Sequence, residues 1–116
     1  LARLAALLGP WPLAGPGHAV ARLALADAVW QANSRDRLAA AGQRLGDLLA
    51  ACGDVTGTPL YATLTTPQAP QLHEHLRSHG ILTRHFEQSD LLRCGLPGGE
   101  GDWQRLAGAV EDWKAR

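Results

Sequence analysis

The sequence lacks net charge, clustered cysteines and long apolar runs, and each absence excludes a class of protein. Eleven basic and eleven acidic residues balance, so charge gives no reason to expect binding to nucleic acid or to an acidic membrane surface. No apolar run reaches the roughly 20 residues that a membrane span needs. The apolar start also lacks the basic region and cleavage site of a signal peptide. We therefore expect a cytoplasmic protein that binds neither nucleic acid nor membrane.

Cysteine is scarce as well. The chain has two cysteines, Cys52 and Cys94, without C-x-x-C spacing. A separated pair of this kind indicates two reduced thiols rather than a disulfide or a metal framework. Cys94 alternates with its neighbours in an apolar segment, so we expect a small core residue and not a nucleophile.

Apolar periodicity predicts alternating helices and strands, and 116 residues are enough for one domain with its own core. The helices are expected from Pro16 to an interruption at Asn33–Ser34, and then over residues 34–51, 67–79 and 101–115. The strands are expected over residues 60–65, 81–86 and 91–96. The expected core comprises Leu38, Leu45, Leu48, Leu49, Leu72, Leu76, Trp103, Leu106, Val110 and Trp113. The predicted fold class is α/β or α+β, with a small sheet of short strands covered on one face by helices.

The first 17 residues are expected to be a helix end and a rigid loop, and residues 18–116 the domain itself. Three prolines and three glycines between Gly9 and Gly17 oppose regular structure. Trp11 stands between two of these prolines, and an aromatic side chain fixed in this way suits a domain interface. Because the chain begins with leucine in a helical pattern, we expect it to be part of a longer polypeptide.

Arg93 is the most informative residue, because it stands inside an otherwise apolar predicted strand. A guanidinium keeps its charge and is rarely buried without a partner. Its planar fork suits a carboxylate or a phosphate held by two parallel hydrogen bonds. The residues alone leave two other possibilities open, which are an acidic partner within the chain and an edge-strand arginine that reaches water.

Two further clusters have both a functional and a structural interpretation. His73, His75 and His79 share one predicted helix, and the last two have the spacing of metal ligands. The neighbouring sequence offers few other ligands, so a solvated histidine-rich surface is favoured over a metal site. The glycines of residues 98–101 open a helix and could hold a phosphate. They match no phosphate-binding fingerprint, so a turn with a helix cap is favoured.

Four segments resemble a known family. They are residues 8–16 (Leu-Gly-Pro-Trp-Pro-Leu-Ala-Gly-Pro), 57–61 (Gly-Thr-Pro-Leu-Tyr), 72–84 (ending Gly-Ile-Leu-Thr-Arg) and 92–97 (Leu-Arg-Cys-Gly-Leu-Pro). Together they resemble the C-terminal small domain of fold-type-I pyridoxal-phosphate enzymes of the aminotransferase class I/II superfamily. Within it, the Gly-Pro-Trp-Pro and Arg-x-Gly-Leu-Pro motifs are similar to the threonine-phosphate decarboxylases of the cobalamin pathway. The resemblance covers nearly the whole chain and only part of such an enzyme.

The resemblance implies a function for Arg93 and an incomplete active site. Arg93 would hold the α-carboxylate of an amino-acid phosphate, with Arg84 and His85 near the substrate. Pyridoxal phosphate would be held mainly by an absent large domain, because the family's Schiff-base lysine precedes this segment and the one lysine here is Lys114. The fragment would contain no catalytic, cofactor-binding or metal-binding residue and would be inactive alone, whereas the complete enzyme would be a homodimer.

The same resemblance implies a reaction and leaves alternatives. L-threonine O-3-phosphate would lose CO₂ to give (R)-1-amino-2-propanol O-2-phosphate, the linker precursor of the corrinoid nucleotide loop. Cys94 departs from the decarboxylase pattern, which has an aromatic residue there, and this weakens the substrate assignment more than the fold. The alternatives are the small domain of a histidinol-phosphate-type aminotransferase and a non-catalytic binding or assembly module.

Overall fold

The computed structural model describes residues 3, 6–7 and 13–116. Contacts within the chain divide it into two compact units, residues 1–34 and 35–116. Trp11 and the rest of residues 9–12 of the predicted loop lie outside the described residues. None of the helices in the described part is long and apolar enough to cross a membrane.

The helix predicted from Pro16 is present, but its interruption was placed wrongly. α2 covers Gly15–Ala26 and α3 covers Ala28–Leu49, so the break falls at Asp27 and not at Asn33–Ser34. The Oδ1 atom of Asp27 accepts a hydrogen bond from the backbone N–H of Trp30 over 2.8 Å. An aspartate in this position caps the start of a helix, and this local contact explains where α3 begins.

The other side of the break is held by an amide side chain. The Nε2 atom of Gln31 donates hydrogen bonds to the carbonyl oxygens of Ala24 and Leu25, over 3.2 and 2.8 Å. These carbonyls belong to the last turn of α2, where intrahelical donors run out, although Ala24 also accepts a hydrogen bond from the backbone N–H of Asp27 over 3.4 Å. The ends of both helices at the break therefore have side-chain partners.

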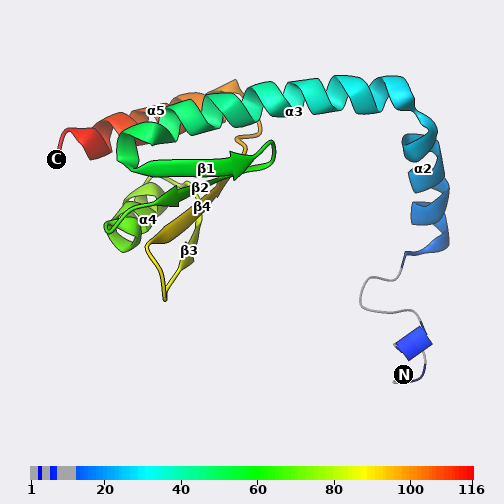
Figure 1. Cartoon of the computed structure of the whole chain (residues 1–116), viewed down its shortest axis with the longest axis horizontal. Helices are drawn as coiled ribbons and strands as arrows, with labels where there is room; N and C mark the ends of the chain where they lie inside the picture. Colours follow the sequence, from blue (N-terminus) through cyan, green and yellow to red (C-terminus); the bar gives the residue numbers. More distant parts are fainter. Residues whose placement is uncertain (1–2, 4–5, 8–12) are drawn as a thin grey trace. The chain divides into compact units, whose positions relative to one another are not determined.

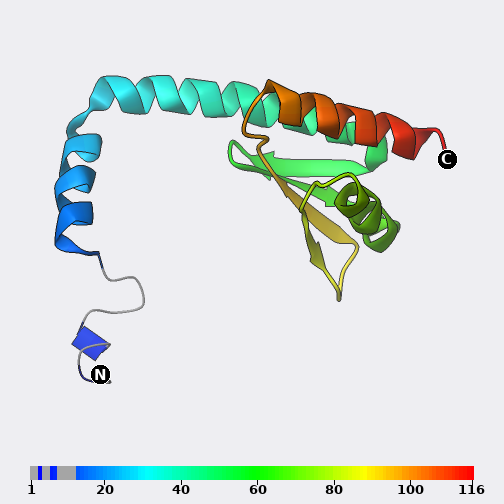
Figure 2. The same ribbon diagram turned by 180° about the vertical axis from the view of Figure 1, so that it is seen from behind.

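Residues 35–116 form a four-stranded sheet with helices on one face. After α3 come the 3₁₀ turn η1 (Ala50–Cys52), β1 (Asp54–Thr58), β2 (Tyr61–Thr65), α4 (Ala69–Ser78), β3 (Arg84–Phe86), β4 (Leu91–Gly95) and α5 (Glu100–Lys114). The strand order is β1-β2-β4-β3, and every neighbouring pair is antiparallel. Figure 1 shows the sheet, and in Figure 2 α4 and α5 lie in front of it. The predicted α+β class is confirmed.

β1 was absent from the prediction, and β3 is shorter than predicted. The sequence of β1, Asp-Val-Thr-Gly-Thr, combines three β-branched residues with an aspartate and a glycine, which strands disfavour. Its place comes from tertiary pairing, since a Cβ atom at Gly57 would lie 2.6 Å from the carbonyl oxygen of Tyr61. β1 thus needs glycine where its backbone approaches β2. β3 begins at Arg84, so residues 81–83 precede the strand instead of forming its first half.

One face of the sheet forms the core with the helices. Side chains alternate along a strand, so Leu92 and Cys94 of β4 share a face with Ala62 and Leu64 of β2. All four are buried. The core also contains Leu45, Leu49, Cys52, Ala69, Leu72, Leu76, Trp103, Leu106, Ala109 and Val110. Of the other residues predicted for the core, Leu48 and Trp113 are partly buried against it, and Leu38 is partly exposed.

Candidate functional site

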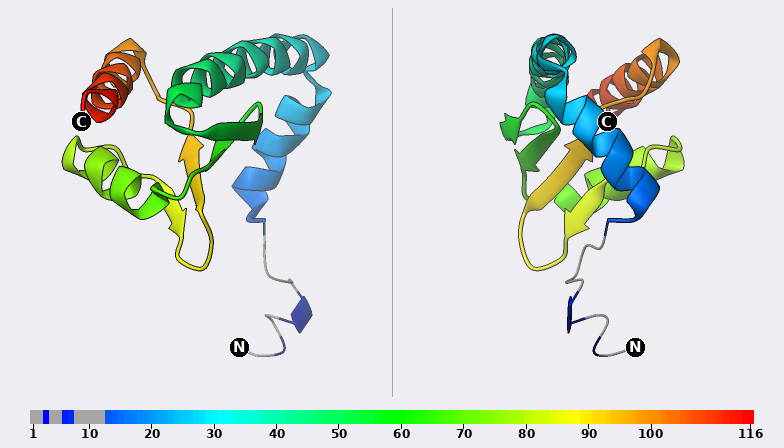
Figure 3. Two further views of the ribbon diagram at one scale, coloured as in Figure 1. Left: turned by 60° about the vertical axis from the view of Figure 1, so that its left-hand side comes forward. Right: turned by 90° about the vertical axis from the view of Figure 1, so that its right-hand side faces the viewer.

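The opposite face of the sheet carries the two predicted substrate-binding arginines. In the middle of the sheet, Arg93 of β4 pairs with Thr63 of β2 on one side and with Arg84 of β3 on the other. Paired residues project to the same face. This face is the one without the buried leucines. In the left view of Figure 3, α4 and α5 lie together on one side of the strands. The structure therefore brings Arg84 and Arg93 side by side.

The guanidinium of Arg93 lies over an aromatic ring. Its Cζ atom is 4.6 Å from the centre of the Tyr61 ring, and Tyr61 pairs with Gly95, two residues along β4. Stacking of this kind fixes the plane of a guanidinium while leaving its N–H edge available for a planar anion. Arg93 is also half-buried, which strengthens any charge interaction that it makes.

No carboxylate of the described residues lies within ion-pair distance of Arg93 or Arg84. Elsewhere, the chain pairs Arg44 with Glu100, Arg77 with Glu74, Arg105 with Asp102, and Lys114 with Glu111. An acidic partner from within the described chain is therefore absent for Arg93. Arg93 also does not stand on an edge strand, because β4 lies between β2 and β3.

Arg84 completes a pair of neighbouring cations. Its Cζ atom is 4.9 Å from the centre of the Phe86 ring on the same strand. Like charges at directly opposite positions of an antiparallel pair are destabilising. An anion bound between Arg84 and Arg93 would remove this repulsion, so the arrangement favours a negatively charged ligand.

His85 does not join this site. It pairs with Leu92 on the helix-covered face, and its ring stacks against that of His73 on α4, with 5.9 Å between the ring centres. Strand alternation thus separates His85 from Arg84, although the two are adjacent in the sequence. Its suggested contact with substrate stays a prediction that this geometry does not favour.

The cysteines lie beneath the site, in the core. Both are free and buried, which agrees with the prediction of two reduced thiols. Burial, together with the nearby thiol of Cys52, raises the pKa of Cys94 to about 12. Burial also raises the pKa of Cys52. A thiol that keeps its proton is a poor nucleophile, so Cys94 supports the sheet and offers no chemistry.

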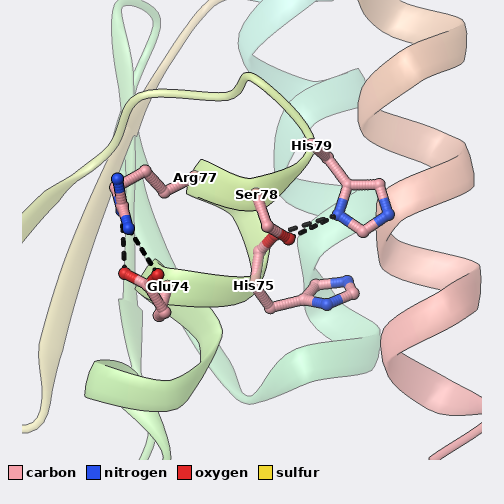
Figure 4. A network of polar contacts seen from close by, with 5 residues as sticks. All are labelled: Glu74, His75, Arg77, Ser78 and His79. Carbon is pink, nitrogen blue, oxygen red and sulfur yellow. Dashed lines mark hydrogen bonds and ion pairs between the residues drawn. The ribbon is translucent and has the colours of Figure 1, made fainter.

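The histidines on α4 and just after it make polar contacts within the domain, and Figure 4 shows His75 and His79. The Nε2 atom of the buried His75 lies 2.7 Å from the carbonyl oxygen of Ala109 on α5. The ring of His79 contacts the carbonyl oxygen of His75 and the carboxylate of Asp112. His73 contacts the hydroxyl of Thr83. The described residues contain no group of three or more potential metal ligands.

Two other candidate features have structural uses. The backbone N–H of Gly99 donates to the Asp102 carboxylate at the start of α5, so the interpretation of this segment as a turn and helix cap is confirmed. Lys114 lies in the last turn of α5 and pairs with Glu111 over 3.0 Å. Since α5 packs on the helix-covered face, Lys114 does not fit the role of a lysine that holds a cofactor beside Arg93.

Sequence reasoning missed Tyr61 as part of the site. The strand containing Tyr61 was predicted, but its pairing with β4 was not. If antiparallel pairing of these two strands had been assumed in the register Thr63–Arg93, the aromatic ring would have been placed next to the arginine. The missing signal was therefore the register, which a single sequence does not supply.

The chain is similar to two curated decarboxylases. It is 45% identical over 116 residues to the threonine-phosphate decarboxylase of Pseudomonas aeruginosa, and 35% identical over 117 residues to that of a Sinorhizobium species. These matches cover 98% and 95% of the chain but 35% and 33% of the relatives, so the chain spans about a third of their length. No family model matches the sequence. The resemblance to threonine-phosphate decarboxylases is confirmed.

Proposed function

We propose that this chain is the small domain of a pyridoxal-phosphate-dependent L-threonine-O-3-phosphate decarboxylase of cobalamin biosynthesis, and that Arg93 binds the substrate's α-carboxylate. The names of the two similar proteins support the reaction. The observation that carries the role of the chain is the geometry of Arg93, which is half-buried, stacked on Tyr61 and without a carboxylate partner among the described residues. Binding by two parallel hydrogen bonds would fix the orientation of the substrate.

Arg84 would bind the second anionic group. An amino-acid phosphate carries a carboxylate and a phosphate, and the open face offers two guanidinium groups on neighbouring strands. Such strands lie about 4.8 Å apart, a separation that a small substrate with two charged ends can bridge. We assign the phosphate to Arg84, which is the more exposed of the two arginines.

The cofactor would be held outside this chain. Pyridoxal phosphate is bound by enzymes as a Schiff base on lysine, and Lys114 does not fit that role because Glu111 pairs with it on the helix-covered side of the sheet. The residues of this chain would bind and orient the substrate, and no bond-breaking step is assigned to them. The chain alone would be inactive.

The test measures two reactions of the complete polypeptide. With pyridoxal phosphate and L-threonine O-3-phosphate, CO₂ release without a ketoacid would support the decarboxylase. Amino transfer that requires a ketoacid would instead indicate an aminotransferase of the histidinol-phosphate type. Neither reaction, without absorbance from bound cofactor, would indicate a non-catalytic module. The 116-residue chain serves as a control that should show no turnover, and sedimentation of the complete polypeptide tests the proposed homodimer.

A further inference from the structure

A groove of about 620 Å³ runs between α3 and β1. Its lining includes Tyr61 and Ala62 of β2, so one end of the groove reaches the residue whose ring stacks on Arg93. Its helix side is lined mainly by small side chains, namely Ala39, Gly42, Gly46 and Ala50. Its strand side is the length of β1 and the turn that follows. In Figure 1 β1 is the strand nearest α3. The groove therefore follows the outer edge of the sheet for the full length of a strand.

The floor of this groove is an edge with free backbone groups. β1 pairs with β2 on one side, and no described segment pairs with its other side. In an antiparallel ladder, every second residue of an edge strand turns its N–H and C=O away from its neighbour. Exposed edges of this kind are templates for another extended chain. The chemistry of the edge thus specifies an extended peptide backbone as the ligand.

The acidic side chains of the groove favour a ligand with basic side chains. Asp47 and Asp54 line the groove, and no lysine, arginine or histidine does. One oxygen of Asp47 accepts a hydrogen bond from Gln43 over 2.7 Å, whereas Asp54 has no partner among the described residues. An extended segment with basic side chains would complement these carboxylates.

The helix wall fits close approach by such a strand. A side chain at Gly46 would meet only the Val55 side chain, 3.9 Å from its Cβ atom. An added fifth strand would direct alternate side chains towards this small-residue surface of α3 and the others towards the open face of the sheet. The groove therefore has room for a side chain beside Gly46, whereas at Gly42 the backbone of Pro59 would lie only 3.0 Å from a Cβ atom.

We propose that the outer edge of β1 binds an extended, basic polypeptide segment, which adds a fifth strand to the sheet beneath α3. A second copy of this chain is a poor occupant. β1 itself carries no cationic side chain that could pair with Asp47 or Asp54 of the other copy, so self-pairing would leave these carboxylates without a cationic partner. The partner is thus a different segment, and its binding to β1 does not require the substrate assigned to Arg93 and Arg84.

The experiment titrates the ¹⁵N-labelled 116-residue chain with three capped heptapeptides, followed by NMR. The first alternates valine and threonine with lysine at both ends, the second has glutamate in place of lysine, and the third is the lysine peptide with alternate backbone amides N-methylated. We expect saturable shifts at β1 and the facing side of α3. At low salt the lysine peptide should bind at least about 10-fold more tightly than the glutamate peptide, since exposed charges act strongly there. The N-methylated peptide should not bind.

Variants test separately how the carboxylates of the groove and its open space contribute to peptide binding. The double variant Asp47→Asn/Asp54→Asn should lose the preference for lysine, and Gly46→Leu should abolish binding by filling the groove. Ala40→Leu is the matched control, because this exposed position on α3 does not line the groove, and it should bind as the parent chain does. Far-UV circular dichroism checks each fold. If Gly46→Leu unfolds, the N-methylated peptide still tests strand pairing, and the aspartate variants still test the preference for basic side chains.

Three results would overturn the proposal. One is equal binding of the N-methylated peptide, which would indicate an apolar pocket without strand pairing. Another is the absence of saturable shifts at β1 with any peptide. The third is concentration-dependent association of the chain through β1 without peptide, which would make a second copy the occupant.

Discussion

The two faces of the sheet differ in how their side chains are satisfied, although one strand supplies both. On β4, Leu92 and Cys94 point into the core and are 0% and 3% exposed, whereas Arg93 between them points to the open face. On α3, α4 and α5, four cations have carboxylate partners within the chain, namely Arg44, Arg77, Arg105 and Lys114. These helix cations thus have anions supplied by the chain, whereas the guanidinium groups of Arg93 and Arg84 lie over aromatic rings and have no carboxylate partner among the described residues.

The two faces of the sheet therefore contribute to different properties, one to stability and the other to binding. Burial of apolar area and internal ion pairs stabilise the fold, so residues on the helix-covered side need no ligand. Cations without internal partners add repulsion to the folded state and become useful only when an anion binds. Changes on the two faces should therefore affect different measurements.

The largest effect on stability is expected for Leu92→Ala. Leu92 is fully buried between β2 and β3 and under the helices, and loss of a buried leucine leaves a cavity that costs about 3 kcal/mol. Urea unfolding of the 116-residue chain measures the free energy of unfolding. Leu91→Ala, which changes a partly exposed neighbour on the open face, is the control and should cost much less. Equal costs would refute the division between the two faces.

Arg93→Ala should lower activity and leave stability almost unchanged. In the complete enzyme, loss of the carboxylate contact should lower kcat/KM by about 100-fold, while the free energy of unfolding changes by less than about 0.5 kcal/mol. Arg93→Lys should also be impaired, because an ammonium cannot form two parallel hydrogen bonds. Arg105→Ala, on α5, is the control. An unchanged kcat/KM for Arg93→Ala would contradict the assigned role.

Most of the helix-covered face could be predicted from the sequence. Leu72 and Leu76 recur at helical spacing, and Trp103, Leu106 and Val110 do so on the last helix, and all five are buried. Burial of one face imposes such periods directly on the sequence. Arg93 was also noticeable, because a charge interrupts an apolar run.

The features that were missed depend on contacts between distant residues or on a single capping side chain. β1 is a short strand that pairs with β2, and its aspartate and glycine obscure the strand signal of its valine and threonines. The break at Asp27 depends on one carboxylate that caps α3, and Asp27 falls within a helical period that continues across it. The stacking of Arg93 on Tyr61 needs the register of two strands.

A smaller effect is expected from Cys94 at alkaline pH. Its pKa is about 12 in the folded chain and about 8.5 in the unfolded chain. Between these values only the unfolded chain loses the proton, so the stabilisation present below pH about 8.5 is lost as the pH rises. Between pH 7 and about 9.5 the free energy of unfolding should fall by about 1 kcal/mol from this cause. Cys94→Ala should lack that part of the decrease, and an identical decrease in both chains would show that Cys94 is not its source.

The smallest effect is expected for Glu100→Gln, which tests whether the ion pairs of the helix layer matter only to the fold. Arg44 donates to both carboxylate oxygens of Glu100 over 2.9 and 2.7 Å, and these hydrogen bonds lower the pKa of Glu100. A lowered pKa contributes stability above the unfolded value of about 4.3, and that contribution is lost as the pH falls through the folded value. Both side chains are more than half exposed, so solvent screening keeps this contribution to stability small.

The Tm of Glu100→Gln should lie slightly below that of the parent chain at pH 7, and the two Tm values should converge in acid. Because the anion of Arg44 comes from the chain itself, substrate binding by the complete enzyme should not change, in contrast to Arg93→Ala. A loss of substrate binding would show that the two faces are coupled.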